Sequence, residues 1–395
     1  MTTVGLVLLG LPAFFFLYAY LLYPASLLLL TARRRDAPGR GRARSEWPQV
    51  SFSLPAHNEE ARIRGALEAL LAIDYPSDRR QIVVVSDAST DRTDEIVREF
   101  ADRGVELLRL EERGGKTAAE NAAAPYLRGS IVINTDASIR ILPESVKPLV
   151  AAFDDPSVGV ASGRDRSVGD ASTESNQGET GYVGYEMWVR SLETRFGSIV
   201  GASGCFYAIR SDLHRALLPE ALSRDFASAL IARERGYRAV SVDPAVCLVP
   251  RTGSLKAELR RKARTMARGL DTLWFKRRLL NPVRAGSFAW QLFSHKLCRW
   301  LVPLTLPLGL LGLVLLSPRS LFFGVLLVAA LAFLALGLVG LVWPEDRPLP
   351  RIVRTCAFVT ASVWAGLVAW LKAFRRERSA VWEPTRRVEV SGDQA

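Results

Sequence analysis

Two long apolar stretches, one at each end of the chain, constrain the fold most. Residues Val4–Leu30 are almost wholly apolar, and residues Leu301–Leu371 are nearly so. A helix that crosses a bilayer needs about 20 consecutive apolar residues, and the first stretch is long enough for one span. The residues between the two ends have the mixed composition of a soluble domain. We therefore expect a soluble domain that is held in a membrane at both ends.

The first apolar stretch predicts a retained anchor, over residues 1–32, rather than a signal peptide. No Lys or Arg precedes it, and the basic cluster Arg33–Arg44 follows it where a cleavage site would be expected. Basic residues beside a span favour the cytoplasmic side. The following domain is therefore expected at the cytoplasmic face of the cell membrane.

The C-terminal region, residues 301–373, divides at two proline-containing breaks into three candidate spans: Leu301–Leu316, Leu321–Trp343 and Ile352–Leu371. The first of these is short and holds two prolines, so it is the weakest of the three. Four crossings in all would place the C-terminus outside. The tail, residues 374–395, is basic, which favours the inside, so the side of the C-terminus stays open.

The formal net charge of +12 is concentrated before the C-terminal spans. Between Arg251 and Arg284 eleven Lys or Arg residues face only two acids, Glu258 and Asp271. This pattern predicts amphipathic interfacial helices over residues 251–300, lying on anionic lipid headgroups. A cradle for a pyrophosphate is the alternative. Nothing else in the sequence supports nucleic-acid binding.

The four cysteines form no Cys-x-x-Cys pair, and the chain has only three histidines. A zinc site is therefore not expected, and reduced structural thiols are the preferred interpretation.

Residues 48–250 alternate between strand and helix patterns. The expected strands are Val50–Leu54, Gln81–Ser86, Val105–Leu110, Ser130–Asn134 and Val158–Ser162, and the helices between them are Asn58–Ile73, Thr93–Ala101, Lys116–Tyr126 and Pro143–Phe153. This order predicts an α/β domain with a mostly parallel sheet and right-handed crossovers. Ligands of such sheets bind beyond the carboxyl ends of the strands.

Acidic residues follow two of these strands, at Asp87 and Asp136. Transfer of a sugar from a nucleotide donor develops negative charge on the leaving diphosphate, which a carboxylate-held divalent cation, Mg²⁺ or Mn²⁺, stabilises. A separate carboxylate is needed to take a proton from the acceptor hydroxyl. For a single Asp a turn role is the simpler interpretation, but two at corresponding strand ends favour a site.

The order and spacing of three short motifs resemble glycosyltransferase family 2, whose fold is called GT-A. Residues 53–60 resemble the turn that cups the nucleoside, residues 85–91 the motif whose first Asp contacts the base, and residues 114–121 the helix start near the phosphates. The resemblance covers roughly residues 48–301. It implies a nucleotide-sugar donor, with a UDP-sugar expected, bound by Pro55, Ala56, Asn58, Glu59, Asp87, Lys116 and Asp136.

The family's metal motif is Asp-x-Asp, and this chain has Asn134-Thr135-Asp136. The resemblance implies a divalent cation held by Asp136, with Asn134 offering a carbonyl oxygen.

Two later segments resemble the acceptor side of the family's site. A Gly-rich strand implies acceptor contacts from Gly201, Ala202, Ser203, Gly204 and Cys205. Ser223-Arg224-Asp225 resembles the Thr-Glu-Asp motif of the catalytic base. Asp225 matches the base, and Arg224 replaces Glu.

Polymerising members of the family carry Gln-x-x-Arg-Trp in the basic segment. Here Arg261 replaces Gln, Arg264 matches the Arg that faces the diphosphate, and Thr265 replaces Trp. Both arginines are expected on the donor side, but the lost Trp weakens the case for processive synthesis.

The leading hypothesis is an inverting, metal-dependent membrane glycosyltransferase that extends a polysaccharide of the cell envelope, like the cellulose, hyaluronan and poly-N-acetylglucosamine synthases. The first alternative is single transfer to a lipid-linked acceptor. A catalytically inactive glycan-binding scaffold is an alternative from another class. A membrane-attached nucleotidyltransferase is disfavoured, because residues 57–60 are not a Gly-rich phosphate loop.

Overall fold

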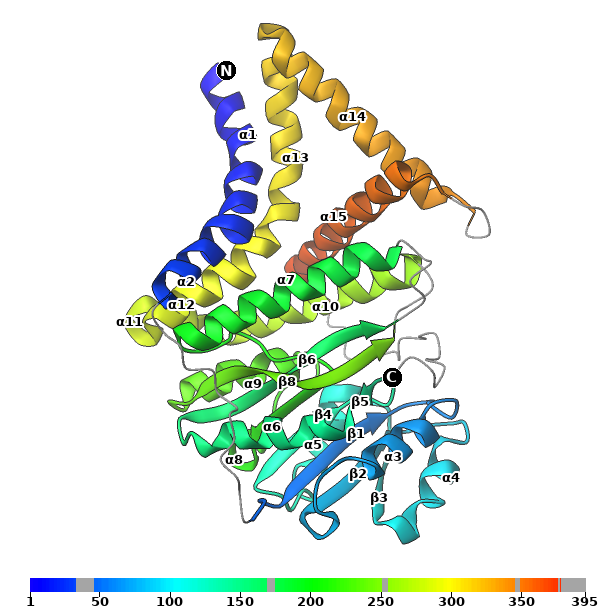
Figure 1. The fold of residues 1–395 in the computed structure, drawn as a ribbon. Coiled ribbons are helices and arrows are strands. Elements are labelled where there is room, and N and C mark those ends of the chain that lie inside the picture. The colour runs from blue at the N-terminus through cyan, green and yellow to red at the C-terminus, as the bar shows by residue number, and fades with distance from the viewer. Residues whose placement is uncertain (33–45, 169–174, 251–254, 345–348, 376, 378–395) are drawn as a thin grey trace. The chain divides into compact units, whose positions relative to one another are not determined.

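The computed structural model describes residues 1–32, 46–168, 175–250, 255–344, 349–375 and 377, except for the side chains of 175–182 and 255–258. Arg33–Arg44 and most of the basic tail lie outside the described residues. The chain divides into two compact units (Figure 1). One contains Met1–Leu29, Gly253–Leu270 and Ala289–Glu377, and the other contains Leu30–Thr252 and Asp271–Phe288.

The second unit is built on one eight-stranded sheet (Figure 1). Its strands are β1 (Val50–Ala56), β2 (Arg80–Asp87), β3 (Val105–Leu110), β4 (Ile131–Thr135), β5 (Arg140–Ile141), β6 (Val158–Val168), β7 (Phe206–Arg210) and β8 (Arg238–Pro250). Their order is β3-β2-β1-β4-β7-β6-β8-β5. Strands β3, β2, β1 and β4 are mutually parallel, β7 is antiparallel to both of its neighbours, β6 is parallel to β8, and β5 is antiparallel to β8.

All five predicted strands are present, and the predicted mostly parallel sheet is confirmed. One strand outside that predicted series, β7, lies between β4 and β6 and is antiparallel to both. Residues Phe206–Ile209 of β7 are all buried, so this short strand fills the central position next to β4.

Helices cover both faces of the sheet. They are α3 (Ile63–Leu71), α4 (Thr93–Arg98), α5 (Lys116–Ala123), α6 (Val146–Ala151), α7 (Ser175–Phe196), α8 (Ser211–His214) and α9 (Arg224–Glu234). The same unit contains the short helix α11 (Pro282–Ala285) and 3-10 turns at Ser77–Arg79, Ala101–Arg103, Pro143–Ser145, Ala152–Asp154 and Arg277–Leu280. Alternate strand residues point to opposite faces. Phe52 and Ile133 therefore join one apolar cluster, while Val132 and Tyr207 join the other.

The first unit consists of long apolar helices. They are α1 (Thr2–Leu17) and α2 (Tyr23–Thr31), joined by a π-helical turn at Tyr18–Leu22, then α10 (Leu255–Phe275), α12 (Ser287–Leu292), a second π-helical turn at Phe293–Leu297, α13 (Cys298–Leu316), a 3-10 turn at Ser317–Arg319, α14 (Leu321–Val342) and α15 (Arg351–Arg375). Helices α10 and α12 each continue into the second unit.

Four stretches among the described residues are long and apolar enough to cross a membrane: Thr2–Thr31, Ser287–Arg319, Leu321–Val342 and Arg351–Arg375. Each of the four predicted spans coincides with or lies within one of them, to within one residue at either end. The weakest candidate, Leu301–Leu316, belongs to a continuous stretch of 33 residues, so its two prolines do not end the helix.

Small residues allow these helices to pack closely. A Cβ added at Gly309 of α13 would lie 2.6 Å from Cγ of Pro12 on α1, and one at Gly312 would lie 2.7 Å from the carbonyl oxygen of Gly5. On α14, Gly337 and Gly340 meet α15 in the same way. Such contacts are typical of helix pairs in membranes.

Candidate functional site

The loops that follow β1 and β2 are bonded to each other at the carboxyl ends of the strands. The backbone N–H of Thr90 donates to Oδ1 of Asn58 at 2.8 Å, and the N–H of Glu59 donates to Oγ1 of Thr93 at 2.8 Å. Asn58 and Ala88 each adopt a φ of 52°. That left-handed conformation is uncommon for Ala, so the tight turn after β2 is held by these cross-loop bonds.

Asp87 fixes the start of α5. Its Oδ1 and Oδ2 accept hydrogen bonds from the backbone N–H groups of Gly114 and Gly115, both at 2.8 Å. The side chain is buried, and Gly115 has a φ of 86°, a value that favours glycine. The sequence pattern predicts that Asp87 contacts the base of the donor. In this structure its carboxylate organises the turn that precedes Lys116.

Lys116 and Asp136, both predicted to bind the donor, form an ion pair. Nζ of Lys116 lies 2.5 Å from Oδ1 of Asp136 and donates to the carbonyl oxygen of Gly204 at 2.8 Å. Burial works against the charged form, but Asp136 and Glu120 outweigh it and raise the pKa of Lys116. Lys116 is therefore an ammonium at any working pH, placed to meet a negatively charged group.

Asp225 lies at the first turn of α9, next to Gly204. Its Oδ1 accepts from Oγ of Ser223 at 2.6 Å, and a Cβ at Gly204 would lie 3.3 Å from its Oδ2. No donor in the described part of the chain is bonded to that second oxygen. The structure thus leaves one oxygen of a half-buried carboxylate able to accept a proton, which is what a general base requires.

The predicted acceptor segment, residues 201–205, is hydrogen-bonded to Asp225 of α9 and to Asp165 of β6. The N–H of Ala202 donates to the carbonyl oxygen of Asp225 at 3.4 Å. Oγ of Ser203 donates to Oδ1 of Asp165 at 2.6 Å and accepts from the N–H of Cys205 at 3.1 Å. Asp165, on β6, is not among the predicted site residues. Nothing in its local sequence marks it, because its position depends on the pairing of β6 with β7 and β8.

The residues for a divalent cation are only partly assembled. No hydrogen bond from the described residues reaches Oδ2 of Asp136, whereas Oδ1 of the buried Asn134 lies 3.2 Å from Nε2 of His214. The described residues contain no cluster of three or more His, Cys, Asp or Glu side chains that could hold a metal. One carboxylate together with donor phosphates and water is a common Mg²⁺ arrangement, so Asp136 fits this role better than Asn134.

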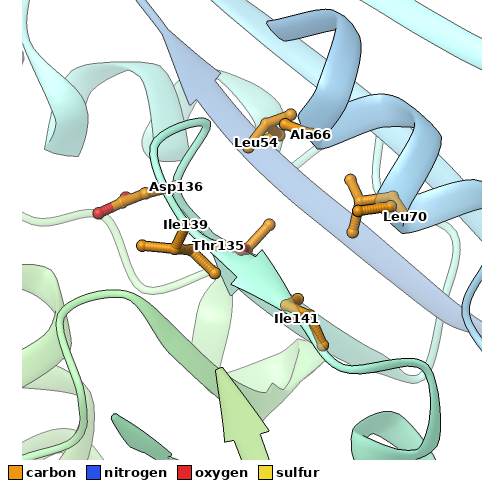
Figure 2. Close-up of a pocket in the computed structure, with 8 residues that line it drawn as sticks. Leu54, Ala66, Leu70, Thr135, Asp136, Ile139 and Ile141 are labelled. Carbon is orange, nitrogen blue, oxygen red and sulfur yellow. The ribbon is translucent and has the colours of Figure 1, made fainter. Parts of the chain in front are cut away.

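A small pocket is lined by residues of β1, α3, β4, β5 and the β4–β5 connection (Figure 2). Apolar side chains provide most of its lining, and Asp136 extends away from Leu54, Ala66 and Leu70. We do not assign the donor to this pocket, because only Thr135 and Asp136 contribute polar groups to its edge.

The remaining predicted residues have different positions. Pro55 and Ala56 are buried residues of β1, and the turn predicted to cup the nucleoside follows that strand. Arg261 and Arg264 lie on α10, in the unit that holds the apolar helices. Their role toward the donor therefore stays a prediction, as does the role of every predicted residue above.

A family model described as glycosyl transferase family 2 matches residues 51–218. Among curated relatives, a probable glycosyltransferase of Bacillus subtilis is 34% identical over 35% of this chain and 34% of its own length. An N-acetylglucosaminyltransferase of Rhizobium meliloti is 28% identical over 63% of each protein. A beta-monoglucosyldiacylglycerol synthase of Nostoc is 27% identical over 38% of this chain and 33% of its own length. The alignments thus cover less than two thirds of these relatives.

A solved structure with a similar fold is a mannosyltransferase from Pyrobaculum calidifontis in complex with GDP-Man and Mn²⁺. It is 23% identical, with a TM-score of 0.75, over 95% of this chain and 99% of its own. The match covers the sheet domain and the apolar helices, and it identifies the fold as GT-A with candidate membrane helices at both ends. Residues 51–218 of this chain form a domain of glycosyl transferase family 2.

Proposed function

We propose that this protein is a membrane glycosyltransferase that moves a sugar from a nucleotide-diphospho-sugar to an acceptor hydroxyl with inversion at the anomeric carbon. The observation that carries the proposal is the meeting of two groups at Gly204. Its carbonyl oxygen binds Lys116, which pairs with Asp136, and its Cα faces Asp225. Gly204 therefore contacts both the cation proposed to serve the donor and the carboxylate proposed to serve the acceptor.

The reaction is a single displacement. Oδ2 of Asp225 takes the proton of the acceptor hydroxyl as its oxygen attacks the anomeric carbon of the sugar. The bond between that carbon and the diphosphate oxygen breaks, and the nucleoside diphosphate leaves from the opposite side. Because attack and departure occur on opposite faces, a single displacement inverts the configuration.

The donor side stabilises the leaving group. Lys116 is the first residue of α5 and follows Gly115 directly. Its ammonium supplies positive charge toward a diphosphate. Asp136 is the residue that fits a bound divalent cation. When bound, such a cation supplies charge stabilisation for the diphosphate. Either Mg²⁺ or Mn²⁺ suits oxygen ligands.

The four apolar helices support attachment to the cell membrane, with the family 2 domain at the cytoplasmic face where nucleotide sugars are made. A growing polysaccharide and a lipid-linked acceptor would both be presented at that surface. One relative is named an N-acetylglucosaminyltransferase and another a beta-monoglucosyldiacylglycerol synthase. These names support the reaction class, and both acceptors stay in the proposal.

The test uses the full chain purified in nanodiscs and screened against UDP-sugars and GDP-sugars with Mg²⁺ or Mn²⁺. We expect release of nucleoside diphosphate from one donor, loss of it in EDTA, and a decrease of roughly a thousandfold for Asp225→Asn. Product length then separates the acceptors, because a ladder indicates a polysaccharide and a single product indicates one transfer. Consumption of no donor, or an Asp225→Asn variant as active as the wild type, would contradict the proposal.

A further inference from the structure

Glu120 is a buried carboxylate that the proposed reaction does not use. It lies on α5, one helical turn after Lys116, and only 1% of its surface is exposed. Neither of its side-chain oxygens accepts a hydrogen bond within the described part of the chain. Buried carboxylates are normally paired and fully bonded, so this side chain needs an explanation.

Two cations from two different helices act on this carboxylate. Lys116 of α5 and Arg224 of α9 both stabilise its charged form, and Nε of Arg224 approaches its Oε2 to 3.5 Å. The rest of the Arg224 guanidinium bonds to the side-chain oxygen of Asn121, and to the carbonyl oxygen of His214 at 2.9 Å. Arg224 precedes Asp225 directly, so the bonds of this guanidinium help to fix the first turn of α9.

Stability does not account for Glu120. Burial raises its pKa even though Lys116 and Arg224 oppose the shift. A carboxyl group whose pKa is raised by folding destabilises the folded state when it is ionised. Charges that are kept in spite of such a cost are characteristic of functional sites.

We propose that Glu120 is a positioning residue of the transfer reaction, whose carboxylate holds the donor-side Lys116 and the Arg224-Asp225 start of α9 in one fixed arrangement. The inference rests on the proposed function, and it adds a residue that touches neither donor nor acceptor. A small displacement of reacting groups can lower a rate by about a hundredfold. Loss of the carboxylate is therefore expected to affect both ends of the site.

The experiment compares the wild-type full chain with Glu120→Gln and Glu120→Asp, using the donor that the wild type consumes. For Glu120→Gln we expect kcat to fall about a hundredfold through Asp225 and the KM for donor to rise about tenfold through Lys116. Its melting temperature should stay the same or rise, because the neutral amide removes the cost of a buried charge. Glu120→Asp keeps the charge at a shorter reach, and an intermediate kcat is expected.

Glu234→Gln is the matched control. Glu234 lies at the other end of α9, where it pairs with Lys276 at 2.5 Å near the surface, and its substitution should leave kcat and KM unchanged. A Glu120→Gln protein that melts at a lower temperature but turns over at the wild-type rate per folded molecule would show a structural role and overturn the inference. A wild type that consumes no donor would overturn the proposed function itself, and the inference with it.

Discussion

Gly204 lies between Lys116 and Asp225, the groups proposed to serve the donor and the acceptor, and a side chain there would be crowded. A Cβ there would lie 3.3 Å from Oδ2 of Asp225 and would cover the oxygen proposed to take the proton. We expect Gly204→Ala to lower kcat by about 10-fold to 100-fold with little change in melting temperature. Gly65→Ala, where an added Cβ meets nothing within 4 Å, is the control. Unchanged turnover of Gly204→Ala would contradict the proposed contact.

The pH dependence of stability tests the environment of Glu120 separately from activity. The folded protein raises its pKa above the ordinary 4.5, so this group stabilises the fold fully below about pH 4.5 and loses that contribution as the pH rises through the folded value. A glutamine at this position does not ionise, so the Glu120→Gln variant shows no such loss of stability as the pH rises. We therefore expect the melting temperature of the variant, relative to wild type, to increase between pH 5 and pH 8, measured in EDTA.

The other charged or titratable groups around Glu120 are Lys116, Arg224, Asp136, Asp225 and Tyr207. All of them are present in both proteins, so the difference reports the Glu120 charge together with its interactions with these groups. A difference in melting temperature that decreases as the pH rises would show that the folded pKa of Glu120 is not raised.

The sequence indicated which residues gather at the site but not how each is used. Lys116, Asp136 and Asp225 are recognisable because they stand in short motifs with known spacing. Glu120 lies within the motif at residues 114–121, but a glutamate in an Ala-rich helix is usually a solvated residue, so the pattern gave it no role. Its burial arises only when α9 brings Arg224 against α5, and that contact joins segments about a hundred residues apart.

At the scale of elements, the Gly114-Gly115 turn joins β3 to α5 and depends on Asp87 of β2. Charge-assisted hydrogen bonds of this kind contribute about 1.5–3 kcal/mol each. Asp87→Asn keeps one acceptor but turns an NH₂ group toward a backbone N–H. We expect a loss of about 2 kcal/mol in the free energy of unfolding together with weaker binding of UDP or GDP, measured by denaturant titration and calorimetry.

The same variant separates two roles for Asp87. A direct contact with the base, as the motif predicts, requires weaker nucleotide binding at unchanged stability, whereas the role in the turn requires both effects. Asp102→Asn, at an exposed position in a 3-10 turn, is the control and should change neither. Unchanged stability of Asp87→Asn would contradict the part that the structure assigns to its two hydrogen bonds.

Strand β7 shows why the sheet was only partly predictable. Its five residues follow a Gly-rich segment and give too short a pattern to reveal direction or partner. Pairing with β4 and β6 is decided by packing, because Tyr207 and Ile209 join one apolar cluster while Phe206 and Ala208 join the other. The parallel half of the sheet was predictable since each of its strands is followed by a helix, which forces a crossover.

At the scale of the whole molecule, the helices decide on which side of the membrane each end lies. The family 2 domain occupies the chain between the first candidate span and the other three. Three crossings after the domain place residues beyond Arg375 on the opposite side from it. The basic residues near that end favour the domain's side, so the two expectations conflict and can be tested against each other.

We expect the helices to prevail, because each of the three later stretches is between 22 and 33 residues long and meets the length that a bilayer requires. The stretch Ser287–Arg319 contains the weakest of the predicted spans. Gly309 and Gly312 in this stretch pack closely on α1, as helices do when two of them cross a membrane side by side. A protease site added after Ala395 should therefore be cut from outside intact spheroplasts, while one placed after Ser77 is cut only after lysis. Protection of both sites would mean that one of the three C-terminal helices does not cross, and the basic tail would then have determined the topology.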